Sequence, residues 1–241
     1  MRWGMTMPPD QERPLRRPVG RPRGDGRPHL TRTVVFLAAA RLIAEHGYAG
    51  TSIRMIAREA EASPASLFNL FAGKDELLNE LILYLAQPSL AFYGDLEAEV
   101  GAGAAPSAAL YRMVFEEARL VASVDRAYVA VFLLPELRQS QFGPARAARR
   151  ALVAHYQRLI LGGLGDGTLV CDQPHLAAEQ LFQLTETSLI MDETQPPLSP
   201  DDLARATARF CLRGLLADPA RLADLEAEAA QLRSSLILPQ V

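Results

Sequence analysis

The 241-residue sequence has few of the residues that metal sites, redox centres and hydrolytic enzymes need. It contains two cysteines, Cys171 and Cys211, which lack metal or disulfide spacing, so we expect buried free thiols. The four histidines show no ligand spacing and no pairing with an acid, and the chain contains no Gly-x-Ser-x-Gly motif. We therefore predict no catalytic residues, no metal, no cofactor and no enzymatic activity.

Long hydrophobic runs are also missing. The longest ones, at 34–40 and 127–134, are well short of the roughly 20 apolar residues that cross a bilayer. The first fourteen residues, MRWGMTMPPDQERP, lack the apolar stretch of a secretory signal. We expect a cytoplasmic protein without a membrane partner.

The charge of the chain is distributed unevenly. The overall net charge is −3, but residues 1–80 carry +3 and residues 81–241 carry −6. Residues 1–29 are rich in Pro, Gly and Arg and poor in apolar residues, which predicts a flexible basic arm. A basic front and an acidic back are typical of a protein that touches nucleic acid with one end.

Apolar residues recur at helical spacing through the remaining chain, and no alternating strand pattern appears, which predicts an all-α fold. We expect the first helix to end at Gly47, with Tyr48 folding back onto its buried face. The glycines of 162–167 follow no predicted strand, so we read them as a connection and not as a nucleotide-binding loop. After a helix that begins near Gly73 and ends near Leu85, further helices are expected at 89–100, 107–123, 124–137, 144–161, 174–192, 200–216 and 219–233.

Residues 51–71, TSIRMIAREAEASPASLFNLF, predict two short helices joined by a tight turn. Ile53, Ile56, Ala57 and Ala60 form the buried stripe of the first helix. In the second, Ser63 is a good N-cap and Pro64 suits the first helical position, whereas Leu67 and Phe71 point inward. This leaves small and polar side chains on the outer face, which can lie close to base edges and phosphates in a DNA groove.

The stretch from Arg32 to Leu85 resembles the DNA-binding domain of the tetracycline-repressor (TetR) family. The match includes Gly47-Tyr48, Thr51-Ser52, Ile56-Ala57, Leu67-Phe68 and Lys74, in the order and spacing of that family. The resemblance implies an N-terminal three-helix helix-turn-helix domain, here 30–86, followed by a larger helical domain for dimerisation and ligand binding, here 87–241. This chain departs from the family at the turn, where Glu61 replaces a usual glycine, and at Phe68 and Leu70, where phosphate-reaching side chains are common.

Several residues are expected to contact operator DNA. Thr51 and Ser52 would offer a hydroxyl and free amide groups to a phosphate, and by family analogy Lys74 would hold another. Arg54 would reach a phosphate or a guanine edge, although an ordinary surface arginine is the alternative. We expect the ring of Phe68 to pack against the preceding helix. The expected DNA-contacting set is Arg21, Arg23, Thr51, Ser52, Arg54, Ser63, Pro64, Ala65, Ser66, Phe68, Asn69 and Lys74.

The basic arm allows two interpretations. Residues 20–24, Gly-Arg-Pro-Arg-Gly, resemble an AT-hook core, and Arg21 and Arg23 would enter the narrow minor groove of A·T-rich DNA. The alternative is a tail that only aids solubility. We favour groove binding, since it would supply charge contacts that Phe68 and Leu70 do not.

A homodimer is expected, because one short recognition helix reads too few bases for useful specificity. Its interface is predicted at Leu181, Leu184, Ser188, Met191, Ala208, Leu212 and Leu215, unless these stripes pack within one subunit. A small hydrophobic effector is expected among Phe92, Tyr111, Phe115, Tyr128, Phe132 and Tyr156, although such residues often form ordinary core.

The sequence thus predicts a homodimeric DNA-binding transcriptional regulator, a repressor that its effector releases from the operator. A ligand-independent DNA-binding protein and a helical protein-interaction scaffold are the alternatives.

Overall fold

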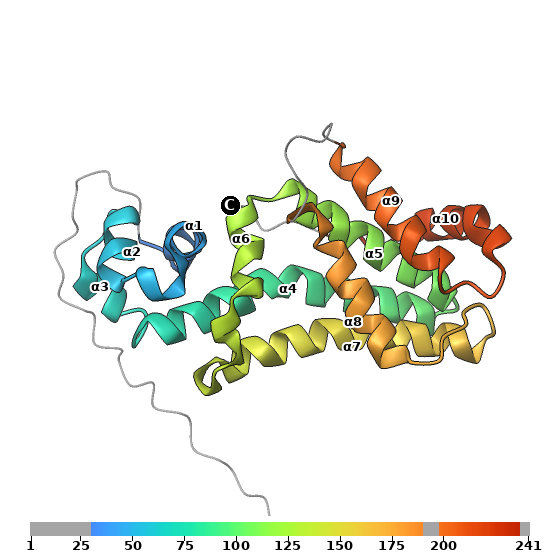
Figure 1. The fold of residues 1–241 in the computed structure, drawn as a ribbon, viewed down its shortest axis with the longest axis horizontal. Helices are drawn as coiled ribbons and strands as arrows, with labels where there is room; N and C mark the ends of the chain where they lie inside the picture. The colour runs from blue at the N-terminus through green and yellow to red at the C-terminus, as the bar shows by residue number, and fades with distance from the viewer. Residues whose placement is uncertain (1–29, 190–197, 237–241) are drawn as a thin grey trace, which may run out of the picture.

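The computed structural model describes residues 30–189 and 198–236. Within these ranges every regular element is a helix, apart from an isolated bridge between Leu169 and Leu216, so the all-α prediction is confirmed. Figure 1 shows α1, α2 and α3 at one end of an elongated molecule and the other helices in a larger body. The α-helices are α1 (Arg32–Gly50), α2 (Ile53–Glu59), α3 (Pro64–Phe68), α4 (Lys74–Gly101), α5 (Pro106–Ser123), α6 (Arg126–Ala130), α7 (Gly143–Gly165), α8 (Pro174–Thr185), α9 (Pro200–Arg213) and α10 (Leu222–Ala230).

Short 3-10 helices complete the connections, and none of the described helices is long and apolar enough to cross a bilayer. Three predicted site residues, Arg21, Arg23 and Met191, lie outside the described residues. The 3-10 segments are Val131–Leu133, Pro135–Arg138, Ser140–Phe142, Thr187–Leu189 and Pro219–Arg221.

The N-terminal domain has a core of its own, built from the stripes that helical spacing predicts. Ile56 and Leu67, on α2 and α3, are fully buried against α1 and the first turns of α4. At Gly47 the backbone turns to φ 72°, a conformation that favours glycine, and Tyr48 then folds back into the core as predicted. The buried residues contributed by α1 and α4 include Val35, Phe36, Ala39, Leu42, Ile43, Leu77, Leu78, Leu81 and Ile82.

Helix α4 joins the two parts of the molecule without a break, where the sequence predicted two helices separated near Pro88. A proline inside a helix removes one hydrogen bond to the carbonyl four residues earlier. Burial on both sides of this position explains why the helix continues, since α4 contributes Leu81 to the N-terminal core and Phe92 and Leu96 to the larger one. The predicted domain boundary at 86/87 therefore falls within a continuous helix.

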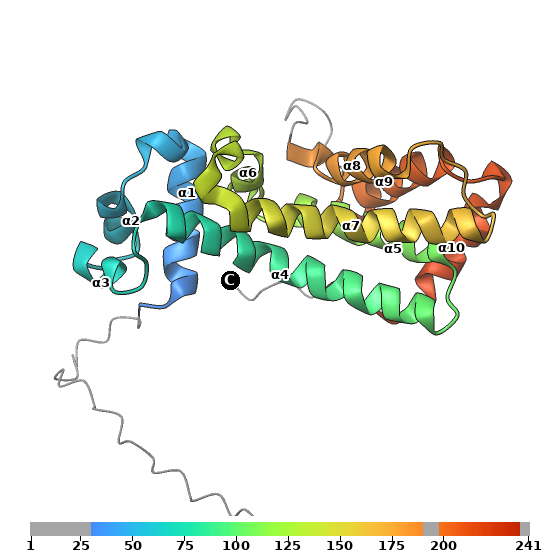
Figure 2. The same cartoon turned by 90° about the horizontal axis from the view of Figure 1, so that it is seen from below.

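The larger body is arranged around α5, which packs against α4, α7, α8, α9 and α10. Figure 2 shows α4 and α7 running side by side along it. The predicted helix at 124–137 is wrong in extent, because the short α6 gives way to 3-10 turns before Pro135. The connection predicted over the glycines of 162–167 is also wrong in part, since α7 continues through Gly165.

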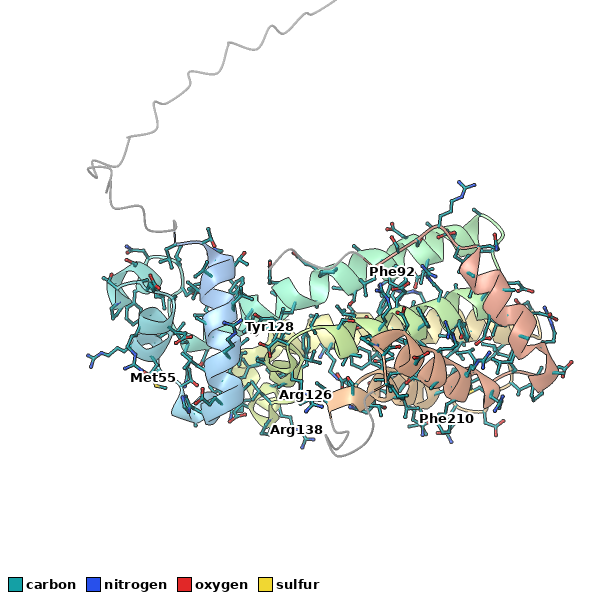
Figure 3. All side chains as sticks on the ribbon, turned by 90° about the horizontal axis from the view of Figure 1, so that it is seen from above. Met55, Phe92, Arg126, Tyr128, Arg138 and Phe210 are labelled. Carbon is teal, nitrogen blue, oxygen red and sulfur yellow. The ribbon has the colours of Figure 1, made fainter. Side chains whose placement is uncertain are left out.

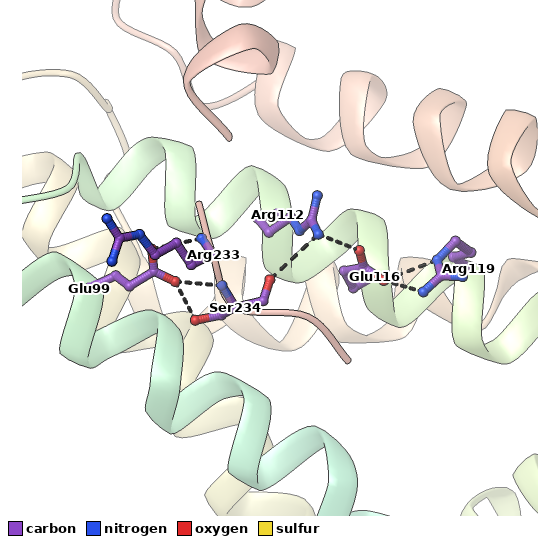
Figure 4. Close-up of polar contacts among 6 residues, drawn as sticks. All are labelled: Glu99, Arg112, Glu116, Arg119, Arg233 and Ser234. Atoms are coloured by element: carbon purple, nitrogen blue, oxygen red, sulfur yellow. Dashed lines mark hydrogen bonds and ion pairs between the residues drawn. The ribbon is translucent and has the colours of Figure 1, made fainter. Parts of the chain in front are cut away.

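The described C-terminal segment crosses α4 and α5 as an extended strap, where the sequence predicted helix as far as residue 233. The backbone amides of Arg233 and Ser234 donate to the Glu99 carboxylate at 3.0 and 2.8 Å (Figure 4). Arg112 of α5 reaches the Ser234 carbonyl at 3.5 Å, and Leu236 is buried. The strap therefore connects the far end of α4 to α5.

Gly163→Ala is expected to destabilise the protein, because the added Cβ would lie 2.5 Å from two side-chain carbons of Leu169. Overpacking of this kind costs about 1–3 kcal/mol of unfolding free energy, measurable by urea denaturation followed by circular dichroism. Gly165→Ala is the matched control, since open space surrounds its Cβ, and should be neutral or slightly stabilising. Equal stability of the two variants would contradict this account.

Candidate nucleic-acid interface and effector cavity

The turn between α2 and α3 has the left-handed residue that a helix-turn-helix needs. Glu61 has φ 51°, and the amide of Ala62 donates to the Ala57 carbonyl at 2.8 Å, which closes the end of α2. The left-handed conformation costs a non-glycine residue of order 1–3 kcal/mol. The side chain of Glu61 is exposed, so the turn keeps the shape expected of a glycine there despite this strain.

Helix α3 is held by its cap and by one buried side chain. The Ser63 hydroxyl accepts from the Ser66 amide at 3.1 Å, and Pro64 occupies the first turn, as the sequence predicts. Leu67 is fully buried, which fixes the rotation of the helix. The outer face then consists of Pro64, Ala65, Phe68 and Asn69, which are exposed, and Ser66, which is half-buried.

Phe68 does not lie where the sequence predicted. Its side chain is 56% exposed and so projects from α3 on the same face as Ala65 and Asn69, whereas we expected its ring to pack against α2. The reason is geometric, because Leu67 already occupies the inward position and the next residue of a helix turns about 100° away. An exposed aromatic ring is thus part of the outer face.

Thr51 is structural, contrary to the expectation that its hydroxyl meets a phosphate. Its side chain is buried, and the single proton of its hydroxyl is shared between the carbonyls of Leu42 at 3.0 Å and Gly47 at 2.9 Å. These carbonyls lie at the C-terminal end of α1, where the break at Gly47 leaves acceptors without helical partners. Ser52 is exposed, and its hydroxyl caps α2 by accepting from the Met55 amide at 3.3 Å.

Lys74 also points inward, although the family resemblance implies that it holds a phosphate. Its ammonium donates to the carbonyls of Tyr48 at 2.7 Å and Thr51 at 2.9 Å and lies 4.1 Å from the centre of the Tyr48 ring. The Tyr48 hydroxyl donates to Asp75, and burial, followed by that bond, raises the pKa of Tyr48. These contacts between Lys74 and the end of α1 were not predicted from the sequence, although Gly47-Tyr48 and Lys74 were all recognised as part of the family pattern.

The exposed cations that remain on α2 are Arg54 and Arg58. They lie beside two exposed acids, Glu59 and Glu61, so this surface has little net positive charge. Met55, half-buried between them, lies at the end of the domain remote from the larger body (Figure 3).

A cavity of about 320 Å³ lies where α4, α5, α6, α7 and α8 meet. Of the predicted ligand residues, Tyr128 and Phe132 line it. Figure 3 shows Tyr128 at the junction between α1 and the larger body. The other four are not among the lining residues: Phe92 is buried in the core, Tyr111 donates to Glu226 at 2.5 Å, Phe115 packs on the core from outside, and Tyr156 is fully buried beside Tyr93.

The cavity wall is mostly apolar but includes buried carboxyl groups that the sequence did not single out. Glu117 accepts from the Tyr93 hydroxyl at 2.7 Å, and burial raises its pKa. Glu186 accepts from Gln183 at 2.5 Å, and burial raises its pKa to about 7. Ser89 and Thr185, both buried, add hydroxyl groups to the same wall.

The predicted dimer stripes are largely used within the subunit. Leu181, Ala208 and Leu212 are buried in the core of the larger body, and Leu184, Ser188 and Leu215 are half-buried. The outer surface of α8 and α9 instead forms a groove of about 640 Å³. Phe210 on its α9 side is 71% exposed and stands at the outer edge of the molecule in Figure 3.

The match to a known protein family lies within the N-terminal domain. Residues 36–81 match the family model described as "Bacterial regulatory proteins, tetR family". No curated protein sequence matches significantly.

Among solved structures, Mycobacterium smegmatis AmtR is 28% identical over 89% of this chain and 100% of its own, with a TM-score of 0.65. Bacillus subtilis FadR in complex with stearoyl-CoA is 18% identical over 76% and 99%, with a TM-score of 0.60. AibR in complex with isovaleryl coenzyme A and operator DNA is 19% identical over 74% and 96%, with a TM-score of 0.63. FadR and AibR, which are less similar in sequence than AmtR, share the fold of this chain.

Thr51→Val should lower the free energy of unfolding by about 1–2 kcal/mol, because the two carbonyls lose a buried donor. Thr51→Ser keeps the hydroxyl and is the control; thermal and urea unfolding compare the two. Because Thr51 does not face solvent, folded Thr51→Val should keep the wild-type salt dependence of DNA binding. An unchanged stability together with weaker DNA binding at every salt concentration would instead indicate a phosphate contact.

Proposed function

We propose that this chain, whose residues 36–81 match the TetR family of bacterial regulatory proteins, is a homodimeric repressor that a small apolar effector releases from its operator. The observation that carries the proposal is the outer face of α3, whose side chains, small or polar apart from Phe68, are held outward by the burial of Leu67. No bulky charged side chain stands on that face to keep it from base edges.

Base readout falls to the exposed residues of α3. Asn69 offers an amide that can pair with an adenine edge, and Ala65 and Phe68 offer apolar contact to a thymine methyl or the sugar-phosphate backbone. Ser63 and Ser66 share a hydrogen bond of 2.8 Å, so their hydroxyls contribute while also capping the helix. Ser52 and Arg54, exposed at the start of α2, position the domain on phosphates.

Few groups on this surface can neutralise phosphate charge, because the ammonium of Lys74 donates to backbone carbonyls within the domain. Arg54 and Arg58 are exposed, but two acids lie beside them. We therefore assign the remaining charge contacts to the arginines of residues 1–29, with Arg21 and Arg23 entering the minor groove. Their electrostatic contribution would make operator affinity strongly dependent on salt.

Dimerisation is assigned to the outer surface of α8 and α9. Phe210 and Leu176 are 71% and 48% exposed there, and the groove between the helices gives each a place on a second copy. Exposed aromatic groups beside a groove mark protein interfaces, and a twofold interface pairs the same surface of both subunits. Two recognition helices would then read successive major grooves about 34–36 Å apart.

Effector release is assigned to the cavity and to α6, which separates it from α1. Tyr128 lines the cavity and also belongs to the core of the N-terminal domain. Asp125, a further lining residue at the start of α6, lies 3.6 Å from Arg41 of α1. A molecule that displaces α6 therefore moves the surface on which α1 rests, and the spacing of the recognition helices changes.

The acyl-CoA ligands named for FadR and AibR are not transferred to this chain. Coenzyme A carries several phosphate charges, and no lysine, arginine or histidine is among the described residues that line the cavity. The shared fold thus supports a ligand site in this part of the molecule but not the same ligand.

Operator selection from random DNA, followed by gel-shift titration, tests the DNA-binding proposal. Asn69→Ala should lower operator affinity about tenfold, with loss of discrimination at one base position and unchanged affinity for random DNA. Arg54→Ala should weaken both and reduce the salt slope by about one. Gln231→Ala removes an exposed amide from the end of α10 and is the control. Failure of the wild-type protein to prefer any sequence would refute the proposal.

Phe210→Glu should convert the dimer to monomers at micromolar concentration, because it replaces the exposed apolar anchor of the proposed interface with a charged side chain. Light scattering measures the mass, and operator affinity should fall with it. Leu133→Glu replaces another exposed apolar residue, 46% exposed and far along the chain from α9, and should leave the dimer intact. A wild-type monomer, or a Phe210→Glu dimer, would exclude this surface.

A further inference from the structure

The cavity between α4, α5, α6, α7 and α8 differs from an ordinary apolar pocket in its charges. Three acidic residues line it, Glu117, Glu186 and Asp125, while its described lining includes no basic residue. Glu117 and Glu186 are only 8% and 7% exposed. A group of either sign is costly to bury without a partner, so these carboxyl groups need an explanation.

Their neighbours show that neither carboxyl group is paired with a cation. Glu117 receives a hydrogen bond from the Tyr93 hydroxyl, Glu186 receives one from the Gln183 amide, and neither forms an ion pair within the described part of the chain. Arg149, the cation that acts on Glu186 from α7, is itself paired with Glu179 at 2.8 Å.

Glu116, next to Glu117 on α5, provides a comparison within the same helix. It is also buried, yet it pairs with Arg112 at 3.0 Å and with Arg119 at 2.6 Å (Figure 4). The chain therefore supplies two guanidinium groups to one buried glutamate and none to its neighbour. The difference between them is that Glu117 faces the cavity.

From this arrangement we infer that the effector is a lipophilic cation, an apolar body of modest size with one ammonium-type group that lies between Glu117 and Glu186. The inference rests on the proposed effector site and specifies its chemistry. The remaining wall matches the apolar body, with Leu120, Val121, Phe132 and Phe182 among its residues. The volume of about 320 Å³ is at the lower end of ligand pockets, which favours a compact molecule.

The protonation of the carboxyl groups is consistent with this role. Burial raises the pKa of Glu186 to about 7 and raises that of Glu117, and the negative charge of Glu117 raises the pKa of Glu186 further. Burial thus favours the neutral form of both acids, which limits the cost of burying them. A bound cation favours their charged forms and gains charge-assisted hydrogen bonds, whereas a carboxylate would be repelled.

Three probes with the same tail and different headgroups test the inference, with the full-length protein: decylammonium, decanol and decanoate, each below its micelle concentration. Isothermal titration calorimetry should show decylammonium binding at least about tenfold more tightly than decanol, and decanoate most weakly. Equal or tighter binding of decanoate would overturn the inference, and so would no binding of decylammonium.

Variants distinguish binding of decylammonium inside the cavity from nonspecific attraction of a cation to an acidic protein. Glu117→Gln and Glu186→Gln should each weaken decylammonium binding about tenfold and leave decanol binding nearly unchanged. Glu228→Gln, which removes a surface carboxylate paired with Arg221, is the control and should have no effect. Thermal unfolding of each unliganded variant verifies the fold. Unchanged decylammonium affinity in both cavity variants would overturn the inference.

Gel-shift titration of the operator is performed separately, so the two proposals can fail independently. Operator binding without decylammonium binding overturns only the ligand inference. Decylammonium binding with the expected variant effects, but without any operator preference, supports the ligand inference and refutes the proposed function as a DNA-binding regulator.

Discussion

One helix, α4, belongs to both hydrophobic cores, and this constraint governs how the two parts of the molecule communicate. Its first turns bury Leu77 and Leu81 in the N-terminal domain, and its later turns bury Phe92 and Leu96 in the larger body. The α6 segment is the second connection, through Tyr128. The cavity lies between these two connections and is lined by both. A molecule bound there would contact both connections between the larger body and the domain that carries α3.

Features that depend on a few neighbouring residues could be predicted from the sequence. Ser63 caps its helix as expected, and Gly47 ends the regular part of α1. The continuity of α4 through Pro88 and of α7 through its glycines could not be predicted in this way. In both places burial against another segment outweighs a local helix-breaking residue, as the close contact of Gly163 with Leu169 illustrates.

The candidate site shows the same limit at the level of single side chains. Residue types around the helix-turn-helix were recognisable, but the directions of Thr51, Lys74 and Phe68 depend on partners elsewhere in the chain. Lys74 turns inward because the end of α1 presents two carbonyls to it, and that geometry exists only after folding. The apolar stripe of α9 was likewise recognisable, whereas its partner, α5 of the same subunit, was not. Phe210 among arginines was the available signal for the outer face.

Helix α8 gives the cavity and the proposed dimer surface a common wall. Phe182 and Thr185 face the cavity, while Leu181 and Leu184 border the outer groove. Since tightly packed interiors transmit small displacements, a ligand that draws Glu186 toward its charge also shifts the end of α8. In the proposed homodimer, the relative position of the two subunits would then change together with the position of α6 on α1. For a twofold DNA reader both displacements act on one quantity, the distance between the recognition helices, so neither needs to be large.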